Sequence, residues 1–319
     1  MIKRSDQYNG YSSVYEPDDF IMEDINIIKR TNEWKMIIKS EKFNKHESRE
    51  VLKSLVFQGI PLEVRGEVWH KFALVDLDTD FEYSDEICHG VSETADDIIH
   101  RDSDRTFAGS IGNERASNAK DKLIRILQSY AAKDPEIGYT QGMNFVASIP
   151  LVLTVDEKKT FWTFYGMMQN PLIGIRDVFR EGLPGFFVLA EVWLEFVRRK
   201  YPWLKEKLEN NASAAPSIAI ARCFQSMLIA FSVPLELKMI MFDRLIIYGK
   251  VALVSFEMAV IKIFCNELYK CGPEDSAMFL MQVDKQPVFN DVPFIVEAWN
   301  EEWISNHEFE ETKELIMNM

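Results

Sequence analysis

The stretch VSFEMAVIKIFCNEL, residues 254–268, indicates most directly which fold class this chain adopts. Its apolar side chains recur at steps of four and three residues, at Val254, Met258, Ile261, Cys265 and Leu268. Such steps place side chains on one face of a helix, whereas a strand would alternate at every second residue. The stretch therefore predicts a helix with one buried face.

The same period recurs along most of the chain, for example at Leu123, Leu127 and Tyr130, and strand-like alternation is scarce. Glycine, proline and short polar residues interrupt the periodic segments. These breaks lie at residues 59–61, 109–112, 182–185, 202, 210–216, 234, 249, 272–273 and 287. Roughly a dozen helices joined by short loops, and therefore an all-α fold, are expected from this pattern.

The chain is expected to have three parts. Residues 1–30 begin with a mixture of Ser, Asp, Tyr, Asn, Gly and Pro without a regular period, which predicts a mobile arm. The remainder of the 319 residues is long enough, and with 47% apolar residues in the chain apolar enough, to bury a large core. A break near Arg180 suggests two helical subdomains, residues 31–180 and 181–319.

Charge and cysteine usage exclude some functional classes. The chain has 36 Lys and Arg against 50 Asp and Glu, a net charge of −14, which disfavours binding to nucleic acid. Four cysteines stand without a C-x-x-C pair, and no apolar signal core follows Met1, so a reducing, cytoplasmic compartment is expected.

One uncharged stretch, residues 137–155, raises the question of a membrane span. It contains Gln141, Asn144, Pro150 and two glycines, so we interpret it as buried helix in a water-soluble fold. Neither end carries a lipidation signal, and any recruitment to a membrane is expected to go through partners.

The motifs of several enzyme classes are missing from the sequence. It contains no G-x-x-x-x-G-K-[ST], G-x-G-x-x-G, H-E-x-x-H or G-x-S-x-G motif. His100, Arg101 and Asp102 imitate a kinase catalytic loop, but Phe107 stands where that loop needs an asparagine. The five histidines are scattered among charged residues and are expected to have no site role.

Two segments remain informative. In the first, Ile99-x-x-Asp102-x-x-Arg105, helical spacing lets the isoleucine anchor inward while the carboxylate holds the arginine three residues on. In the second, IGYTQGMN at residues 137–144, Gln141 stands between two nearby glycines where an apolar helix begins. Glycine allows a backbone to come close to a partner.

Together with residues 59–61 and Arg65-Gly66-x-x-Trp69, these segments closely resemble the TBC domain, the Rab GTPase-activating family. The resemblance runs from residues 31–35 through residues 202–204 to residues 242–245 and 248–250. It implies an all-α fold whose two helical subdomains form a V-shaped groove. It also implies a Rab-type small GTPase as the partner, in vesicle trafficking.

The resemblance implies that the chain is no enzyme by itself but supplies two catalytic residues in trans. Arg105 matches the arginine finger, which stabilises charge on the transferring γ-phosphoryl group, and Gln141 matches the glutamine finger, which orients the attacking water. The chain would need no cofactor of its own, because the partner holds GTP and Mg²⁺. Supporting roles fall to Asp102, Tyr139, Gly142, Arg65, Trp69 and Ile99, with Arg65 and Trp69 beneath the fingers.

Other interpretations remain open. Arg105 could be only an ion-pair partner of Asp102 or Asp104, and Gln141 only a residue satisfying a free amide at a helix start. The chain could also be a TBC scaffold that binds a GTPase or another trafficking protein without accelerating hydrolysis. The sequence departs from the family where Ala108 replaces the usual proline, and where tryptophans near Cys223 and at Phe242 are replaced.

Overall fold

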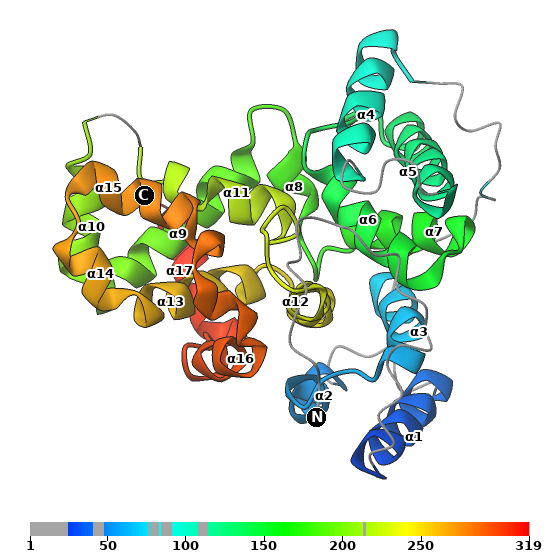
Figure 1. Cartoon of the computed structure of the whole chain (residues 1–319), viewed down its shortest axis with the longest axis horizontal. Coiled ribbons are helices and arrows are strands. Elements are labelled where there is room, and N and C mark those ends of the chain that lie inside the picture. The colour runs from blue at the N-terminus through cyan, green and yellow to red at the C-terminus, as the bar shows by residue number, and fades with distance from the viewer. Residues whose placement is uncertain are drawn as a thin grey trace.

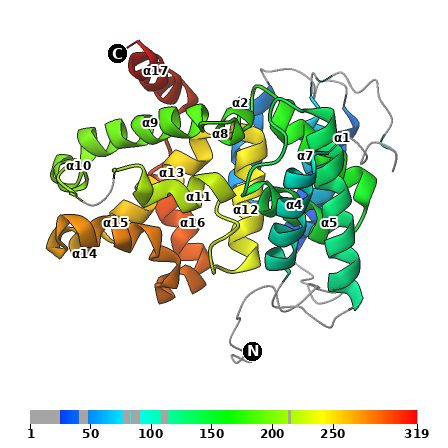
Figure 2. The same ribbon diagram turned by 90° about the horizontal axis from the view of Figure 1, so that it is seen from above.

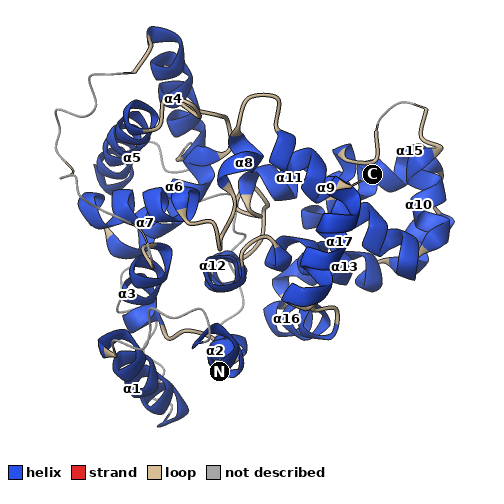
Figure 3. Cartoon of the chain, turned by 180° about the vertical axis from the view of Figure 1, so that it is seen from behind, coloured by secondary structure: helices blue, strands red, loops and turns tan. Residues whose placement is uncertain are grey.

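The computed structural model describes residues 25–40, 48–75, 77, 83, 91–107, 114–212 and 215–318, and every regular element in them is a helix (Figure 1). Figure 3 shows these helices and their loops from behind. The fold class is therefore all-α, as the periodicity predicts. The elements are α1 (Ile25–Lys39), α2 (Ser48–Phe57), α3 (Leu62–Ala73), α4 (Glu93–Thr106), α5 (Glu114–Lys133), α6 (Met143–Thr154), α7 (Glu157–Gln169), α8 (Arg176–Phe179), α9 (Pro184–Lys200), α10 (Pro202–Glu209), α11 (Ile218–Ser226), α12 (Leu235–Tyr248), α13 (Val251–Ile263), α14 (Cys265–Lys270), α15 (Pro273–Met281), the 3₁₀ turns η5 (Val283–Lys285) and η6 (Pro287–Asn290), α16 (Val292–Glu301) and α17 (Asn306–Met317).

The helices are gathered toward two ends of the molecule. Helices α4 to α7 lie at one end and α10, α14 and α15 at the other, with α8, α11 and α12 between them (Figures 1 and 2). The spatial arrangement does not follow chain order throughout, because α12 packs against α2 and α3. Helix α12 thus joins the C-terminal half of the chain to its first helices.

The stretch at residues 254–268 is more buried than one helical face requires. Helix α13 packs against α9, α11, α12, α14 and α16, and even its polar residues Ser255 and Glu257 are buried. The helix ends at Ile263, and after Phe264 the chain continues as α14. The expectation of a single helix with one buried face is therefore wrong for this stretch, because the helix breaks at Phe264 and α13 is surrounded by five other helices.

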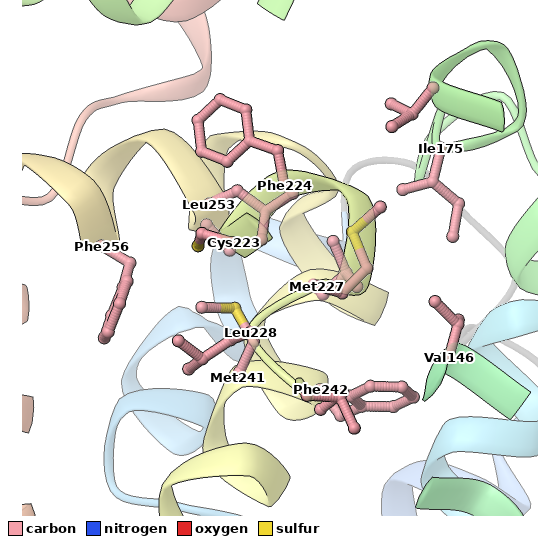
Figure 4. Packing of buried hydrophobic residues seen from close by; sticks show 14 of the residues in the cluster. Val146, Ile175, Cys223, Phe224, Met227, Leu228, Met241, Phe242, Leu253 and Phe256 are labelled. Atoms are coloured by element: carbon pink, nitrogen blue, oxygen red, sulfur yellow. The ribbon is translucent and has the colours of Figure 1, made fainter. Parts of the chain in front are cut away.

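One packing region of the hydrophobic core joins several helices. Figure 4 shows side chains of α6, α11, α12 and α13 gathered there, among them Val146, Phe224, Phe242 and Leu253. Each of these four residues is fully buried. Phe242, which stands where the resemblance leads us to expect tryptophan, packs its ring 5.2 Å from the ring of Trp69 on α3. It is a core residue.

Several expectations concern the ends and the apolar stretch of the chain. Helix α1 begins at Ile25, inside the arm expected over residues 1–30, and residues 1–24 lie outside the described residues. Within residues 137–155, α6 is largely buried, whereas residues 137–142 form a loop. No helix in the described part of the chain is both long and apolar enough to span a bilayer.

Candidate functional site

Arg105 lies in the last turn of α4. The helix begins after Ser92, whose Oγ accepts a hydrogen bond from the Ala95 amide at 3.3 Å, an ordinary N-cap. Ile99 is fully buried and anchors the helix against the core, as its place in the motif suggests. The Arg105 side chain, at the other end, is 65% exposed. The helix thus presents the guanidinium to solvent from a fixed base.

Asp102 holds Arg105 from the protein side. Its side chain is 2% exposed and forms an ion pair with Arg105 Nη2. Tyr139 Oη donates a hydrogen bond to the second carboxylate oxygen of Asp102 at 2.8 Å. Burial, and then the Asp102 carboxylate, raise the pKa of Tyr139, so its hydroxyl stays protonated and available as a donor. A buried carboxylate with two donors orients the exposed guanidinium.

The alternative partner for Arg105, Asp104, is engaged elsewhere. Asp104 is exposed and pairs with Lys120 Nζ at 3.0 Å. The ion pair between Arg105 and Asp102 does not by itself distinguish a catalytic finger from a residue that only forms an ion pair. The large exposure of its side chain is the property that a residue reaching into a partner requires.

Gln141 lies on a loop, residues 134–142, that connects α5 to α6. The loop begins at Asp134, whose carboxylate accepts hydrogen bonds from three other side chains. The donors are Tyr130 at 2.8 Å, Gln169 at 2.7 Å and Arg176, which binds both oxygens at 2.8 Å. These contacts fasten the start of the loop to α5, α7 and α8.

From the hydrogen bonds at Asp134 we expect a contribution to the free energy of unfolding that is lost at acidic pH. Burial alone would raise the pKa of Asp134, but the bonds from Arg176, Tyr130 and Gln169 outweigh it and lower the pKa. A carboxyl group whose pKa is lower in the folded than in the unfolded protein stabilises the fold. Its contribution is complete above the pKa in the unfolded protein, about 3.9, and is lost as the pH falls through the lower pKa of the folded protein.

We therefore expect Arg176→Met to reduce the free energy of unfolding by about 2 kcal/mol at pH 6. The difference from the wild type should narrow as the pH falls below about 4, because Asp134 and Glu136, which both pair with Arg176, become protonated. Urea unfolding at a series of pH values measures both quantities. A difference that stays constant down to the lowest pH at which the wild type is folded would contradict the assignment.

The far end of the loop is held against α8 and α11. Thr140 Oγ1 donates to the Phe179 carbonyl at 2.8 Å. Gly142 has φ +109°, and a Cβ built there would lie 2.3 Å from the Gln225 carbonyl oxygen. Only glycine fits both that conformation and that contact. Gln141 is exposed between these two fixed residues.

The amides of Gly142, just before α6, and of Met143, its first residue, have partners other than Gln141. The Gly142 amide donates to Asn144 Oδ1 at 3.1 Å, and the Met143 amide donates to the Thr140 carbonyl at 3.2 Å. Other groups therefore perform the capping that the alternative interpretation gives to Gln141. Its side chain remains on the surface.

Asn144 is a site residue that the sequence analysis did not single out. It is 2% exposed, and its Nδ2 donates to Thr106 Oγ1 at 2.8 Å, while its Oδ1 accepts from the Gly142 amide. These bonds connect the end of α4 to the start of α6. A detectable signal exists, since Asn144 is a polar residue in an otherwise apolar run, and buried polar groups need partners.

Arg65 and Trp69 form a separate buried cluster between α3 and α12. Arg65 Nε and Nη2 each donate to one oxygen of Asp243 at 3.1 Å, and Trp69 Nε1 donates to Asp243 Oδ1 at 2.8 Å. Arg65 is 7% exposed and Asp243 1% exposed. Burial raises the pKa of Asp243, while the charge of Arg65 and the hydrogen bonds from Trp69 and Arg65 oppose that shift.

The packing of α3 shows which part of α6 lies near this cluster. Gly66, on the same helix as Arg65, approaches α6 at Thr154, where a built Cβ would lie 3.0 Å from Cγ2. Thr154 is the last residue of α6, whereas Gln141 precedes the first. Arg65 joins α3 to α12, so any support that it gives to the finger residues acts through the packing of α3.

Replacing Arg65 by alanine is expected to lower the free energy of unfolding by about 3–5 kcal/mol, because Asp243 would keep a buried charge without its partner. Activity should fall with it. Lys35→Ala is the matched control. Lys35 on α1 pairs with Glu63, which lies on α3 like Arg65, but the side chains of this pair are exposed. That change should cost less than about 1 kcal/mol in urea unfolding. Equal stability of the two variants would mean that the Arg65 pair contributes no more than a surface pair.

Comparisons with known proteins identify a family. A model of the Rab-GTPase-TBC domain matches residues 62–269, a range that includes α4, α6 and both exposed side chains. Ala108, which replaces the proline usual in the family, lies outside the described residues.

Three curated relatives are similar in sequence. GTPase-activating protein GYP5 of Saccharomyces cerevisiae is 27% identical over 211 residues, covering 65% of this chain and 22% of the relative. GTPase-activating protein GYP3 of the same yeast is 24% identical over 326 residues, covering 85% and 51%. Growth hormone-regulated TBC protein 1 of Xenopus laevis is 26% identical over 219 residues, covering 66% and 62%. The chain thus spans less than two thirds of the length of each relative.

Two solved structures share the fold. The Chlamydomonas flagellar RabGAP TBC domain superposes with a TM-score of 0.67 at 19% identity, covering 88% of this chain and 92% of that one. The Ypt/Rab-GAP domain of Gyp1p superposes with a TM-score of 0.60 at 18% identity, covering 88% and 98%. The all-α architecture is therefore that of TBC domains.

Proposed function

The chain belongs to the Rab-GTPase-TBC domain family, and on this premise we propose that it stimulates GTP hydrolysis by a Rab-type small GTPase. One observation carries the proposal. An exposed arginine held by a buried carboxylate, Arg105 on Asp102, is connected through buried hydrogen bonds to the loop that presents Gln141. The family match and the relatives named as GTPase-activating proteins support it.

Arg105 is proposed to enter the active site of the partner. Its planar guanidinium carries several N–H donors, of which Nη2 pairs with Asp102. The positive charge would stabilise the charge that develops on the γ-phosphoryl oxygens, an effect worth roughly 10³ to 10⁵ in rate in GTPase systems. Because Asp102 orients the side chain in the free protein, less ordering is needed on binding.

Gln141 is proposed to orient the attacking water. Its amide offers both a donor and an acceptor, as positioning a water between protein and phosphate requires. The bonds of Asp134, Thr140 and Gly142 fix the loop on either side of it. The chain supplies no cofactor in this scheme, since the partner would hold GTP and Mg²⁺.

The proposed cellular setting follows from the partner. A protein that returns Rab-type GTPases to their GDP form would act in vesicle trafficking. It would work in the cytoplasm and be recruited peripherally to endomembranes through its partners.

Phosphate release from a panel of Rab proteins under multiple-turnover conditions tests the proposal. We expect at least one GTP-loaded Rab to hydrolyse faster with the wild-type chain, and no acceleration with Arg105→Ala. If Rab proteins bind but none is accelerated, the chain is a scaffold with a TBC fold. If none binds, the proposed partner class is wrong.

A further inference from the structure

We propose that Asn144 is a positioning residue that fixes the two fingers relative to each other; this inference rests on the proposed function. Arg105 and Gln141 come from different elements, the end of α4 and the loop before α6. Both must meet one nucleotide at the same time, so the distance between their backbones has to be set before the partner arrives. Asn144 links these two backbones.

The link is a series of hydrogen bonds in which each group donates to the next, from the Gly142 amide through Asn144 and Thr106 to the Asp102 carbonyl. Thr106 Oγ1 donates to the Asp102 carbonyl at 2.8 Å, so its oxygen is free to accept from Asn144 Nδ2 at 2.8 Å. Asn144 Oδ1 then accepts from the Gly142 amide at 3.1 Å. Thr106 directly follows Arg105 and Gly142 directly follows Gln141, so the two residues that Asn144 bonds are each one position from a finger.

The chemistry of the site selects an amide. Asn144 must donate to a hydroxyl on one side and accept from a backbone amide on the other, and a carboxylate could only accept. Its Oδ1 also lies 3.3 Å from Tyr139 Oη, the hydroxyl that donates to Asp102. Asn144 therefore touches the support of both fingers while remaining buried and away from any partner.

Loosening this link should act on the chemical step rather than on binding. Displacing a catalytic group by about 1 Å can cost roughly 10²-fold in rate even when the substrate still binds. Because Asn144 is buried, its loss removes no contact with a GTPase surface. The rate at saturating activator should therefore fall while the half-saturating concentration stays nearly constant.

The test compares Thr106→Val with Thr106→Ser, because valine keeps the shape of threonine without the hydroxyl and serine keeps the hydroxyl. Single-turnover hydrolysis on a responsive Rab should be about 10- to 100-fold slower at saturation with Thr106→Val and with Asn144→Ala. The half-saturating concentration should change less than about threefold, and Thr106→Ser should retain most of the rate. Adding Thr106→Val to Arg105→Ala should slow that variant little further, because residues acting as one unit are not additive.

Hydrogen exchange of the Gly142 amide in the free protein gives a second readout that needs no GTPase. Exchange should be slow in the wild type and Thr106→Ser, and faster in Asn144→Ala and Thr106→Val, with urea unfolding showing that each variant is folded. If the wild type accelerates no Rab, the proposed function fails, and the exchange rates still decide whether Asn144 couples the two segments. Unchanged exchange and unchanged saturating rate in folded Thr106→Val would overturn the inference.

Discussion

Arg105→Lys should lose most of the stimulated GTP hydrolysis although the positive charge is kept. Lysine has one charged nitrogen, so pairing with Asp102 and reaching a phosphoryl oxygen would compete for the same group. The guanidinium can do both, because Nη2 holds Asp102 while the rest of the planar group extends from a side chain that is 65% exposed. Arg105→Ala should remove nearly all stimulation, roughly 10³-fold or more.

Single-turnover hydrolysis at saturating activator measures this loss. Arg101→Lys is the matched control, since Arg101 is exposed on the same helix one turn earlier and bonds only locally, to the Asp97 carbonyl at 3.2 Å. That variant should behave like the wild type. Near-normal rates for Arg105→Lys would argue against direct contact with the transition state.

Gln141→Ala should abolish stimulation of an unmutated Rab, whereas a Rab lacking its own switch glutamine should still respond to the wild-type chain. A Ras-type GTPase ordinarily orients the attacking water with its own glutamine, and its activator contributes arginine. If Gln141 takes over that task, the partner's glutamine becomes dispensable. The anchored loop around Gln141 is consistent with such a role, because a residue that positions water has to be held still.

A two-by-two comparison of hydrolysis rates, with and without each glutamine, decides the point. Gln58→Ala serves as the control, since Gln58 is an exposed glutamine in the turn after α2. Binding of each variant to the Rab has to be measured in parallel. Should the Rab variant lose all response while Gln141→Ala keeps full activity, Gln141 is not the catalytic glutamine, and Arg105 alone remains a candidate.

The helical fold could be predicted because its signal is local. The apolar residues Leu123, Leu127 and Tyr130 recur at helical spacing, and all three are buried on one helix. The two finger segments could likewise be located, since each lies within about eight consecutive residues whose order is distinctive. The side chains of Arg105 and Gln141 are exposed, and their catalytic roles stay predictions.

What escaped prediction depends on residues far apart in the chain. The partner of Arg65, Asp243, lies 178 residues away, and only the packing of α12 on α3 brings the two together. The role of Asn144 was hidden for the same reason, because Thr106 reaches it from another helix, 38 residues away. The burial of α13 on all sides likewise reflects five neighbouring helices rather than its own period.

The contact between Gly142 and the Gln225 carbonyl bears on any attempt to transplant this site. Grafting the end of α4 and the loop before α6 onto another helical scaffold would transfer every side chain proposed to act on GTP. It would leave behind the last turn of α11, against which the backbone beside Gln141 is wedged. A working graft would therefore have to include the last turn of α11 as a third segment. That segment would contribute no catalytic group and would serve only to hold the loop in position.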